Sequence, residues 1–201
     1  VVTNGAGAIV TATSDGFLVD ASPPLCGNTY DGDGADRSWI AATLQIPVSW
    51  TAHRDSTSGV ASYSVAFTEP GATASTFLDV GLVSTAWVPT DALDHDVLYH
   101  AVVRVRDRVG FVTDCLSDGF KLDFTPPTAG QLISKLPSPV THNVQTVAHT
   151  VHIEWAGFHE LESGPCDHVV AMGTAEDITR YWQFQSVGAA MDALLTGLAL
   201  P

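Results

Sequence analysis

The chain has 201 residues, of which only 15% are charged, and its formal net charge is −14. An acidic surface repels nucleic acid and anionic lipid, so the composition argues against both as partners. No apolar run is long enough to span a bilayer, and we expect no membrane insertion in this stretch. Small, β-branched and hydroxylated residues abound, which is typical of antiparallel sandwiches and disfavours helical bundles.

The first 22 residues are predicted to be the last strands of a preceding repeat. A strand end is followed by a Gly-rich turn at Asn4–Gly7 and by a last strand through Phe17 and Val19. Pro23-Pro24 then stops the sheet, because neither ring nitrogen can donate to a ladder. Such a pair forms a stiff, polyproline-like hinge between modules.

Residues 23–124 are predicted to form one complete module, with about seven short strands and no helix. Its strands include 44–50, 61–67, 76–80, 85–88, 98–107 and 117–123. Pro47 lies opposite the apolar face of its strand and predicts a bulge or a weakly paired stretch. Arg104 and Arg106 lie on the outer face of the longest strand, where we expect ordinary pairing with acidic neighbours.

Several sequence motifs recur about one domain length later in the chain. Ser117–Pro127 repeats Ser14–Pro24 at an offset of 103 residues, each copy running from Ser-Asp-Gly-Phe to Pro-Pro. Val48-Ser-Trp50 likewise matches Ile153-Glu-Trp155 at an offset of 105. Several independent matches in one order outweigh any single motif, so the sequence predicts an array of repeats.

Residues 125–201 are predicted to be a second sandwich. Strands are expected at 147–155, 168–172, 184–187 and 193–195, with His168 in the place of Tyr63. By the offset, the last two strands of this module are missing, which would expose a sheet edge and half of a core. We therefore expect that residue 201 is not a natural end or that another segment fills the gap. Truncation of a longer array is favoured over head-to-tail completion by a second copy.

These features resemble the fibronectin type III module. The resemblance is carried by Trp50 and Trp155 on the second strands, by the Tyr-x-Val-x-Phe strand, and by Leu93 six residues before Tyr99. In that family this Leu and Tyr mark the tyrosine corner, in which the phenol bonds back to the preceding crossover backbone. The resemblance implies an all-β fold of tandem fibronectin type III- or immunoglobulin-like antiparallel β-sandwiches, joined by Pro-Pro linkers.

The resemblance places Cys26 and Cys115 at the same end of the complete module, where they are candidates for a disulfide. The bridge would close a loop of about 90 residues and contribute about 3–4 kcal/mol. Cys166 lies at the same end of the next module, so its partner would lie outside the chain. The alternative is three buried free thiols in a reducing compartment.

An acidic loop contains the candidate metal ligands Asp31, Asp33 and Asp36. Alternate carboxylates on a Gly-rich loop can converge on a hard cation such as calcium, although Asp-Gly is also ordinary turn chemistry. No other cofactor is implied. No catalytic motif occurs, so we do not expect an enzyme.

The sequence favours a structural repeat segment of an extracellular or cell-surface protein, which provides spacing, adhesion or fibre assembly. Its partners would be neighbouring repeats of the same chain, with self-assembly into a filament as a special case. One alternative is a ligand- or glycan-binding module, with or without a dependence on calcium, and another is an accessory region of a larger secreted enzyme. The loop at 51–60 has no aromatic residue, which disfavours ligand binding.

Overall fold

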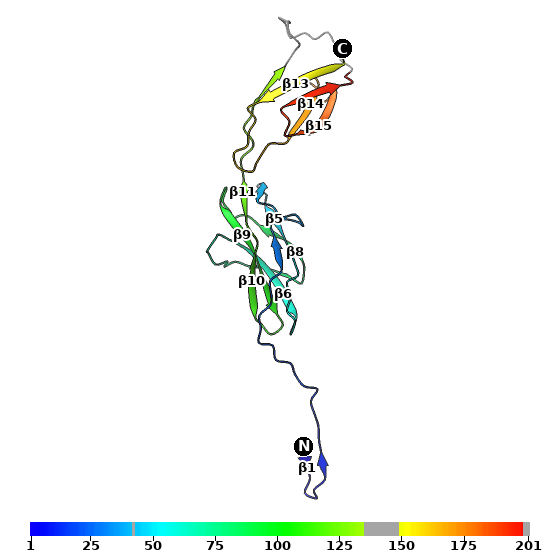
Figure 1. Ribbon diagram of the computed structural model, residues 1–201. Helices are drawn as coiled ribbons and strands as arrows, with labels where there is room; N and C mark the ends of the chain where they lie inside the picture. Colours follow the sequence, from blue (N-terminus) through cyan, green and yellow to red (C-terminus); the bar gives the residue numbers. More distant parts are fainter. Residues whose placement is uncertain (42, 135–148, 199–201) are drawn as a thin grey trace. The chain divides into compact units, whose positions relative to one another are not determined.

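The computed structural model describes every residue except 42, 135–148 and 199–201. The described residues form antiparallel β-strands and no helix, as the sequence predicts (Figure 1). No helix capable of crossing a bilayer is therefore found among them. The chain divides into two compact units, one made of Val1–Ser38 with Thr43–Lys121 and the other of Trp39–Ala42 with Leu122–Pro201.

A sandwich of two sheets is built mostly from residues of the first unit. The smaller sheet has the order β3-β5-β8, and the larger has the order β4-β11-β9-β6-β7, with β10 also paired to β9. The strands are β3 (Asn28–Tyr30), β4 (Trp39–Ala41), β5 (Gln45–Thr51), β6 (Val60–Thr68), β7 (Leu78–Gly81), β8 (Thr85–Pro89), β9 (Leu98–Asp107), β10 (Val112–Leu116) and β11 (Phe120–Asp123). This is the fibronectin type III- and immunoglobulin-like arrangement.

Alternating residues of the two sheets form one core. Val48 and Trp50 of β5 pack in one cluster with Val65 of β6 and with Val103 and Val105 of β9, and all five are at most 2% exposed. The period of two puts these side chains on the inner face of each strand. The core is thus built from the positions where the sequence alternates most regularly.

Pro47 does not cause a bulge, contrary to one of the two expectations for it. Its strand keeps a continuous register with β8, where Pro47 pairs with Trp87. On the other edge, β3 pairs only with residues 49–51, so the proline faces no ladder there. The missing N–H is tolerated because one edge of the strand is free at that point.

The last strand of the first unit is broken into two pieces, of which the sequence analysis predicted only the second. β10 and β11 both pair with β9, β10 along Val102–Arg106 and β11 at Leu98 and Tyr99. Ser117–Gly119 separates them, and Gly119 has a φ of +107°. The Ser-Asp-Gly turn therefore lies between β10 and β11 and interrupts the strand that pairs with β9. It does not mark the start of that strand.

A short hairpin opens the chain. β1 (Val2–Thr3) pairs with β2 (Ile9–Val10). The strand expected through Phe17 and Val19 does not form, and these side chains are 88% and 74% exposed. That prediction was wrong because a strand needs a neighbour, and among the described residues none pairs with this segment.

The second unit contains one three-stranded and one two-stranded sheet. The first has the order β12-β13-β16, and the second pairs β14 with β15. The strands are β12 (Gln131–Ser134), β13 (Thr150–Ala156), β14 (His168–Met172), β15 (Trp182–Gly188) and β16 (Asp192–Thr196). The expected strand at 147–155 is found as β13, and positions 147 and 148 lie outside the described residues.

Candidate functional site

The two units repeat the same local geometry around their tryptophans. The ring of Trp50 lies 5.4 Å from that of Tyr63, and the ring of Trp155 lies 5.4 Å from that of His168, both pairs being tilted. The backbone N–H of each tryptophan donates over 3.0 Å to a backbone carbonyl, that of Ser84 in the first unit and of Met191 in the second. His168 therefore takes the place of Tyr63, as the sequence predicts.

The pairing of the first strands is repeated as well. Leu25 forms an isolated bridge with Arg54, and Thr128 forms the equivalent bridge with His159. In the same way, Thr29 pairs with Trp50 and Leu132 with Trp155. The offsets of these pairs are those found in the sequence, so the internal similarity extends to the register of the strands.

The opening hairpin has the geometry of the β9–β10 turn. The N–H of Asn4 donates to the carbonyl of Ala8 over 3.0 Å, and that of Asp107 donates to Phe111 over 3.1 Å. The Oδ1 atom of Asn4 accepts two backbone N–H groups of its turn, and the Oδ1 atom of Asp107 accepts three. One turn is thus built twice, 103 residues apart, although the residue that orders it differs.

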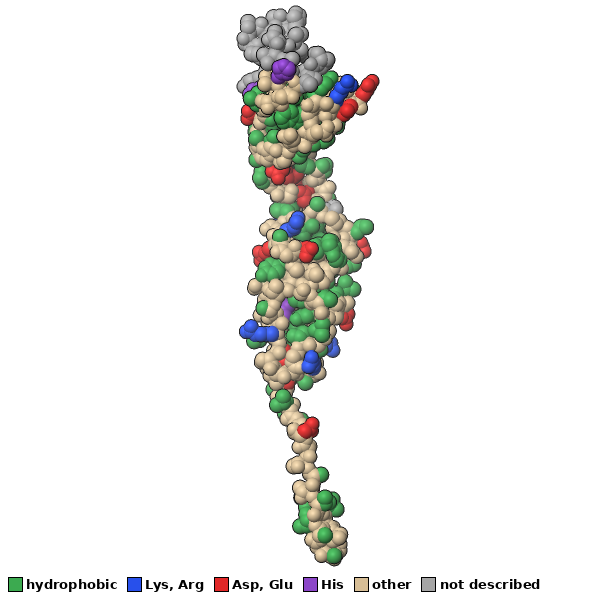
Figure 2. Space-filling model, turned by 90° about the vertical axis from the view of Figure 1, so that its right-hand side faces the viewer, with side chains coloured by type: hydrophobic (Ala, Val, Ile, Leu, Met, Phe, Trp, Pro, Cys, Tyr) green, Lys and Arg blue, Asp and Glu red, His purple; other side chains and the backbone are tan. Residues whose placement is uncertain are grey.

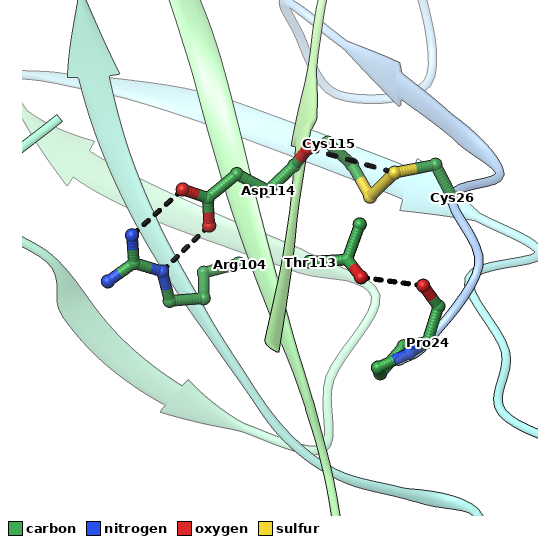
Figure 3. A network of polar contacts seen from close by, with 6 residues as sticks. All are labelled: Pro24, Cys26, Arg104, Thr113, Asp114 and Cys115. Atoms are coloured by element: carbon green, nitrogen blue, oxygen red, sulfur yellow. Dashed lines mark hydrogen bonds and ion pairs between the residues drawn. A yellow bond between two sulfur atoms is a disulfide. The ribbon is translucent and has the colours of Figure 1, made fainter. Parts of the chain in front are cut away.

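The entry to the first sandwich is tied to its edge by a disulfide. Cys26 and Cys115 are bonded, with their Cα atoms 5.6 Å apart, and they are the pair that the sequence analysis names (Figure 3). Beside them, the Thr113 hydroxyl donates to the carbonyl of Pro24 over 2.6 Å. Cys166 is a free thiol here, and its pairing outside the chain stays a prediction.

The outer face of β9 carries an ordinary ion pair. Arg104 donates to both oxygens of Asp114 on β10, over 2.7 and 2.8 Å, and its guanidinium lies 3.9 Å from the ring centre of Phe77. Hydrogen bonding to Asp114 raises the pKa of Arg104. Both side chains are about one-third exposed, so the pair contributes at most about 1 kcal/mol. This is the surface pairing expected from the sequence.

Tyr99 makes the hydrogen bond expected of a tyrosine corner. Its ring is 5% exposed, and its phenol oxygen accepts the backbone N–H of Asp94 over 3.1 Å. Leu93, which is half-buried, begins the same turn by donating its N–H to the carbonyl of Thr90. The corner therefore fixes the crossover that leads into β9.

Gly27 immediately precedes β3 and lies against the backbone at the end of β5. A Cβ atom at this position would lie 2.0 Å from the carbonyl oxygen of Thr51, and the N–H of Gly27 donates to Nδ1 of His53 over 2.7 Å. Burial lowers the pKa of His53, which favours the neutral ring that can accept this bond. In the second unit, a Cβ at Gly130 would lie 2.3 Å from the carbonyl oxygen of Ala156.

We expect Gly27→Ala to destabilise the first unit by about 1–3 kcal/mol, because the added methyl must push two backbones apart. Chemical denaturation followed by tryptophan fluorescence would measure this loss. Gly34→Ala is the steric control, since no atom lies within 4 Å of a Cβ built there. It carries only the strain of a positive φ, which is +75°. Equal losses in the two variants would contradict a steric role for Gly27.

The acidic loop brings together two of its three candidate ligands. Asp31 and Asp36 each place a carboxylate oxygen within 4.8 Å of one from Asp118, and Asp33 is not part of this group. The turn at Gly32–Gly34 leaves Asp33 exposed. Asp118 takes its place in the group because the broken edge strand puts Ser117–Gly119 beside the loop, which local sequence does not reveal.

Asp31 is the buried member of this group, with no exposed surface. Its Oδ2 atom accepts the N–H of Gly119 over 3.1 Å, and its own N–H donates to Asp36 over 3.0 Å. Burial raises the pKa of Asp31 to about 6, and the charges of Asp36 and Asp118 add to that rise. The Ser117 hydroxyl and the N–H of Gly119 act in the opposite direction. Asp31 therefore keeps its proton to a higher pH than an ordinary aspartate and loses it as the pH rises through about 6.

A second acidic group was missed by the sequence analysis. It consists of Asp20, Asp55 and Asp107 of the first unit. Each is the acidic residue of a turn or of the linker, and Asp20 matches Asp123 in the repeated linker. That repetition was the one available signal, because the three residues are far apart in the chain.

The second unit has an apolar groove of about 450 Å³ beside its sheets. It is lined by residues that include Ile153, Trp155, His168 and Phe184. In the first unit, the residues equivalent to Ile153 and Trp155 pack against β9. No strand equivalent to β9 occurs in the described part of the second unit. The groove thus marks the face that β9 covers in the first sandwich.

Lysine and arginine are sparse and isolated on the face shown in Figure 2, in keeping with the acidic composition.

No protein-family model matches the chain, and no curated protein matches it. The chain is similar to the crystal structure of chicken CNTN1 FN1-FN3 domains, with 14% identity and a TM-score of 0.43. The match covers 98% of this chain and 65% of that one. The fold assignment rests on the strand order of the first unit.

Proposed function

We propose that the chain is a structural segment of an extracellular or cell-surface protein, in which β-sandwich repeats are set at a fixed spacing. The observation that carries this proposal is the repetition of hydrogen bonds and strand register about one domain length apart. A binding or catalytic role selects particular residues in loops. A spacer depends instead on a repeated arrangement of strands and backbone hydrogen bonds, and that arrangement is what recurs in this chain.

The linkers support the same function. The Oδ1 atom of Asp20 accepts both the N–H and the hydroxyl of Ser22, and that of Asp123 accepts both groups of Thr125. A Pro-Pro pair follows each of these turns. A hydrogen-bonded turn followed by two prolines restricts the chain at each junction, as a spacer requires.

The disulfide supports an extracellular setting and a load-bearing role. Disulfides persist in oxidising compartments and are rare in the cytosol. This one joins residues that are 89 positions apart, which takes in most of the first sandwich. Force applied along the chain would bypass almost the whole module, because the load passes directly through the two sulfur atoms.

Stretching a single molecule by its two ends tests this role. In the oxidised chain, the first unit should give no long unfolding step. After reduction, a step of about 300 Å should appear, since each freed residue adds about 3.5 Å of contour length. The Cys26→Ala/Cys115→Ala variant should show that step without a reductant. A 300 Å step in the oxidised wild-type chain would contradict the load-bearing role.

Assembly is the finer part of the proposal. The groove of the second unit has an apolar lining of the kind that β9 covers in the first, so a strand with the pattern of β9 is the segment that fits it. Such a strand, supplied by a further repeat or by a second copy, would link modules into a fibre. Light scattering of the 201-residue chain over a range of concentrations distinguishes the two sources. Growth of oligomers with concentration indicates a second copy, and a constant monomer mass excludes it.

A further inference from the structure

Three carboxylates meet where the first linker enters the first sandwich. Asp20 comes from the linker, Asp55 from the loop between β5 and β6, and Asp107 from the last position of β9. One carboxylate oxygen of each residue lies within 4.8 Å of one from each of the other two. Three separate segments therefore bring like charges to a single point.

Backbone N–H groups hold each of these side chains by one oxygen. The Oδ1 atom of Asp55 accepts the N–H groups of residues 57, 58 and 59, over 2.7–3.0 Å. The Oδ1 atom of Asp107 accepts those of residues 109, 110 and 111, over 2.6–2.9 Å. The Oδ1 atom of Asp20 accepts that of Ser22. Because these donors saturate one oxygen and fix the carboxylate plane, the second oxygen is available for another partner.

The second oxygens include two that are buried without a donor. The side chain of Asp107 is 1% exposed, and its Oδ2 atom has no hydrogen-bond partner among the described residues. The Oδ2 atom of Asp20 is also shielded from water and makes no hydrogen bond of good geometry, although the Ser58 hydroxyl lies close enough to interact with this carboxylate. Within the part of the chain that the structure describes, no lysine or arginine forms an ion pair with the three aspartates. A buried carboxylate oxygen with no donor calls for a positive partner.

We propose that Asp20, Asp55 and Asp107 form a calcium site. Calcium takes oxygen ligands at about 2.4 Å, so two ligands of one ion lie at most about 4.8 Å apart, and the carboxylate oxygens of this group lie within that limit. Magnesium requires shorter bonds and a stricter octahedron, and zinc prefers nitrogen or sulfur ligands. Backbone carbonyls and water complete the six to eight oxygens that calcium takes.

Calcium at this position has a structural consequence. It connects a residue of the linker to two turns of the sandwich, so binding orders the segment around Asp20 against the module. The site stands independently of the spacer function, since it is defined by the donors of the first unit alone. An array without mechanical load would still bind the ion.

The test is a titration of the EDTA-treated 201-residue chain with calcium chloride, followed by calorimetry and by thermal unfolding. We expect saturable binding with a Kd in the range of about 0.1–1 mM, together with a rise in Tm. Asp20→Asn should weaken binding about tenfold or more, because it removes one of three charged ligands. It keeps an oxygen for the N–H of Ser22, and its side chain lies outside the sandwich core. Magnesium chloride should bind about tenfold more weakly than calcium.

Two matched variants locate the ion. Asp33→Asn changes the same charge at an exposed position outside both acidic groups, and it should leave calcium binding unchanged. Asp118→Asn alters only the group that contains Asp31, and it should also leave the binding unchanged. The proposal is overturned if about 10 mM calcium gives neither heat nor a Tm shift. It is equally overturned if binding survives in Asp20→Asn and is lost in Asp118→Asn.

Discussion

Reduction of the Cys26–Cys115 disulfide is expected to lower the free energy of unfolding of the first unit by about 4 kcal/mol. The bond closes a loop of 89 residues, and opening it restores the chain entropy that the cross-link removes from the unfolded state. Native contacts are expected to survive, because the Thr29 hydroxyl still donates to the carbonyl of Cys115 and the Thr113 hydroxyl to that of Pro24. Urea unfolding with and without reductant, followed by tryptophan fluorescence, measures the difference.

Two variants make this experiment specific. In Cys26→Ala/Cys115→Ala, the reductant should have no further effect, and the stability should match that of the reduced wild-type chain. Cys166→Ala should keep the full response, because this thiol is free and lies in the other unit. A loss below about 1 kcal/mol on reduction would mean that the unfolded state is not constrained by the bond.

The strands that sequence predicted correctly are those with a regular two-residue alternation. β9 has the bounds expected, Leu98–Asp107, because its inner positions from Tyr99 to Val105 are all apolar. β10 was missed because its pattern carries no such signal: Val112, Asp114 and Leu116 are exposed, and Cys115 alone is buried. An edge strand that is held by a disulfide and a backbone ladder needs no apolar face of its own.

Two copies of one motif have different structures, which local sequence cannot reveal. Phe120 and Leu122 are at most 1% exposed, because β11 lies beside β9. Phe17 and Val19 have the same spacing, yet they are exposed and form no strand. The alternation of apolar residues indicates that a segment can form a β-strand. Whether the strand forms depends on a pairing partner that is distant in the chain.

The acidic sites show the same limit. Sequence placed Asp31, Asp33 and Asp36 together because they are adjacent, and the structure replaces Asp33 by Asp118. The group of Asp20, Asp55 and Asp107 was not predicted at all. Each of its members is identifiable from sequence as a turn residue, but which turns meet at one end of the sandwich depends on the topology of the sheets.

The stability of the first unit is expected to depend on pH through Asp31. Its pKa is raised from 3.8 to about 6 by burial, so between these values the folded state keeps a proton that the unfolded state releases. This contribution to stability is therefore fully present below pH 3.8 and is lost as the pH rises through about 6. A difference of about two pKa units corresponds to about 3 kcal/mol, which is an upper bound on the effect.

The Asp31→Asn variant separates the contribution of Asp31 to the pH dependence of stability from that of the other carboxylates that titrate in the same range. The neutral amide keeps an oxygen for the N–H of Gly119 and presents its NH2 group to Asp36 and Asp118. We expect the variant to exceed the wild type in stability by up to about 3 kcal/mol at pH 7 and to match it near pH 4. Urea unfolding of both proteins from pH 4 to 7.5, in the presence of EDTA, measures this difference. Asp33→Asn should show no such trend, and a difference for Asp31→Asn that does not change with pH would mean that Asp31 is ionised throughout.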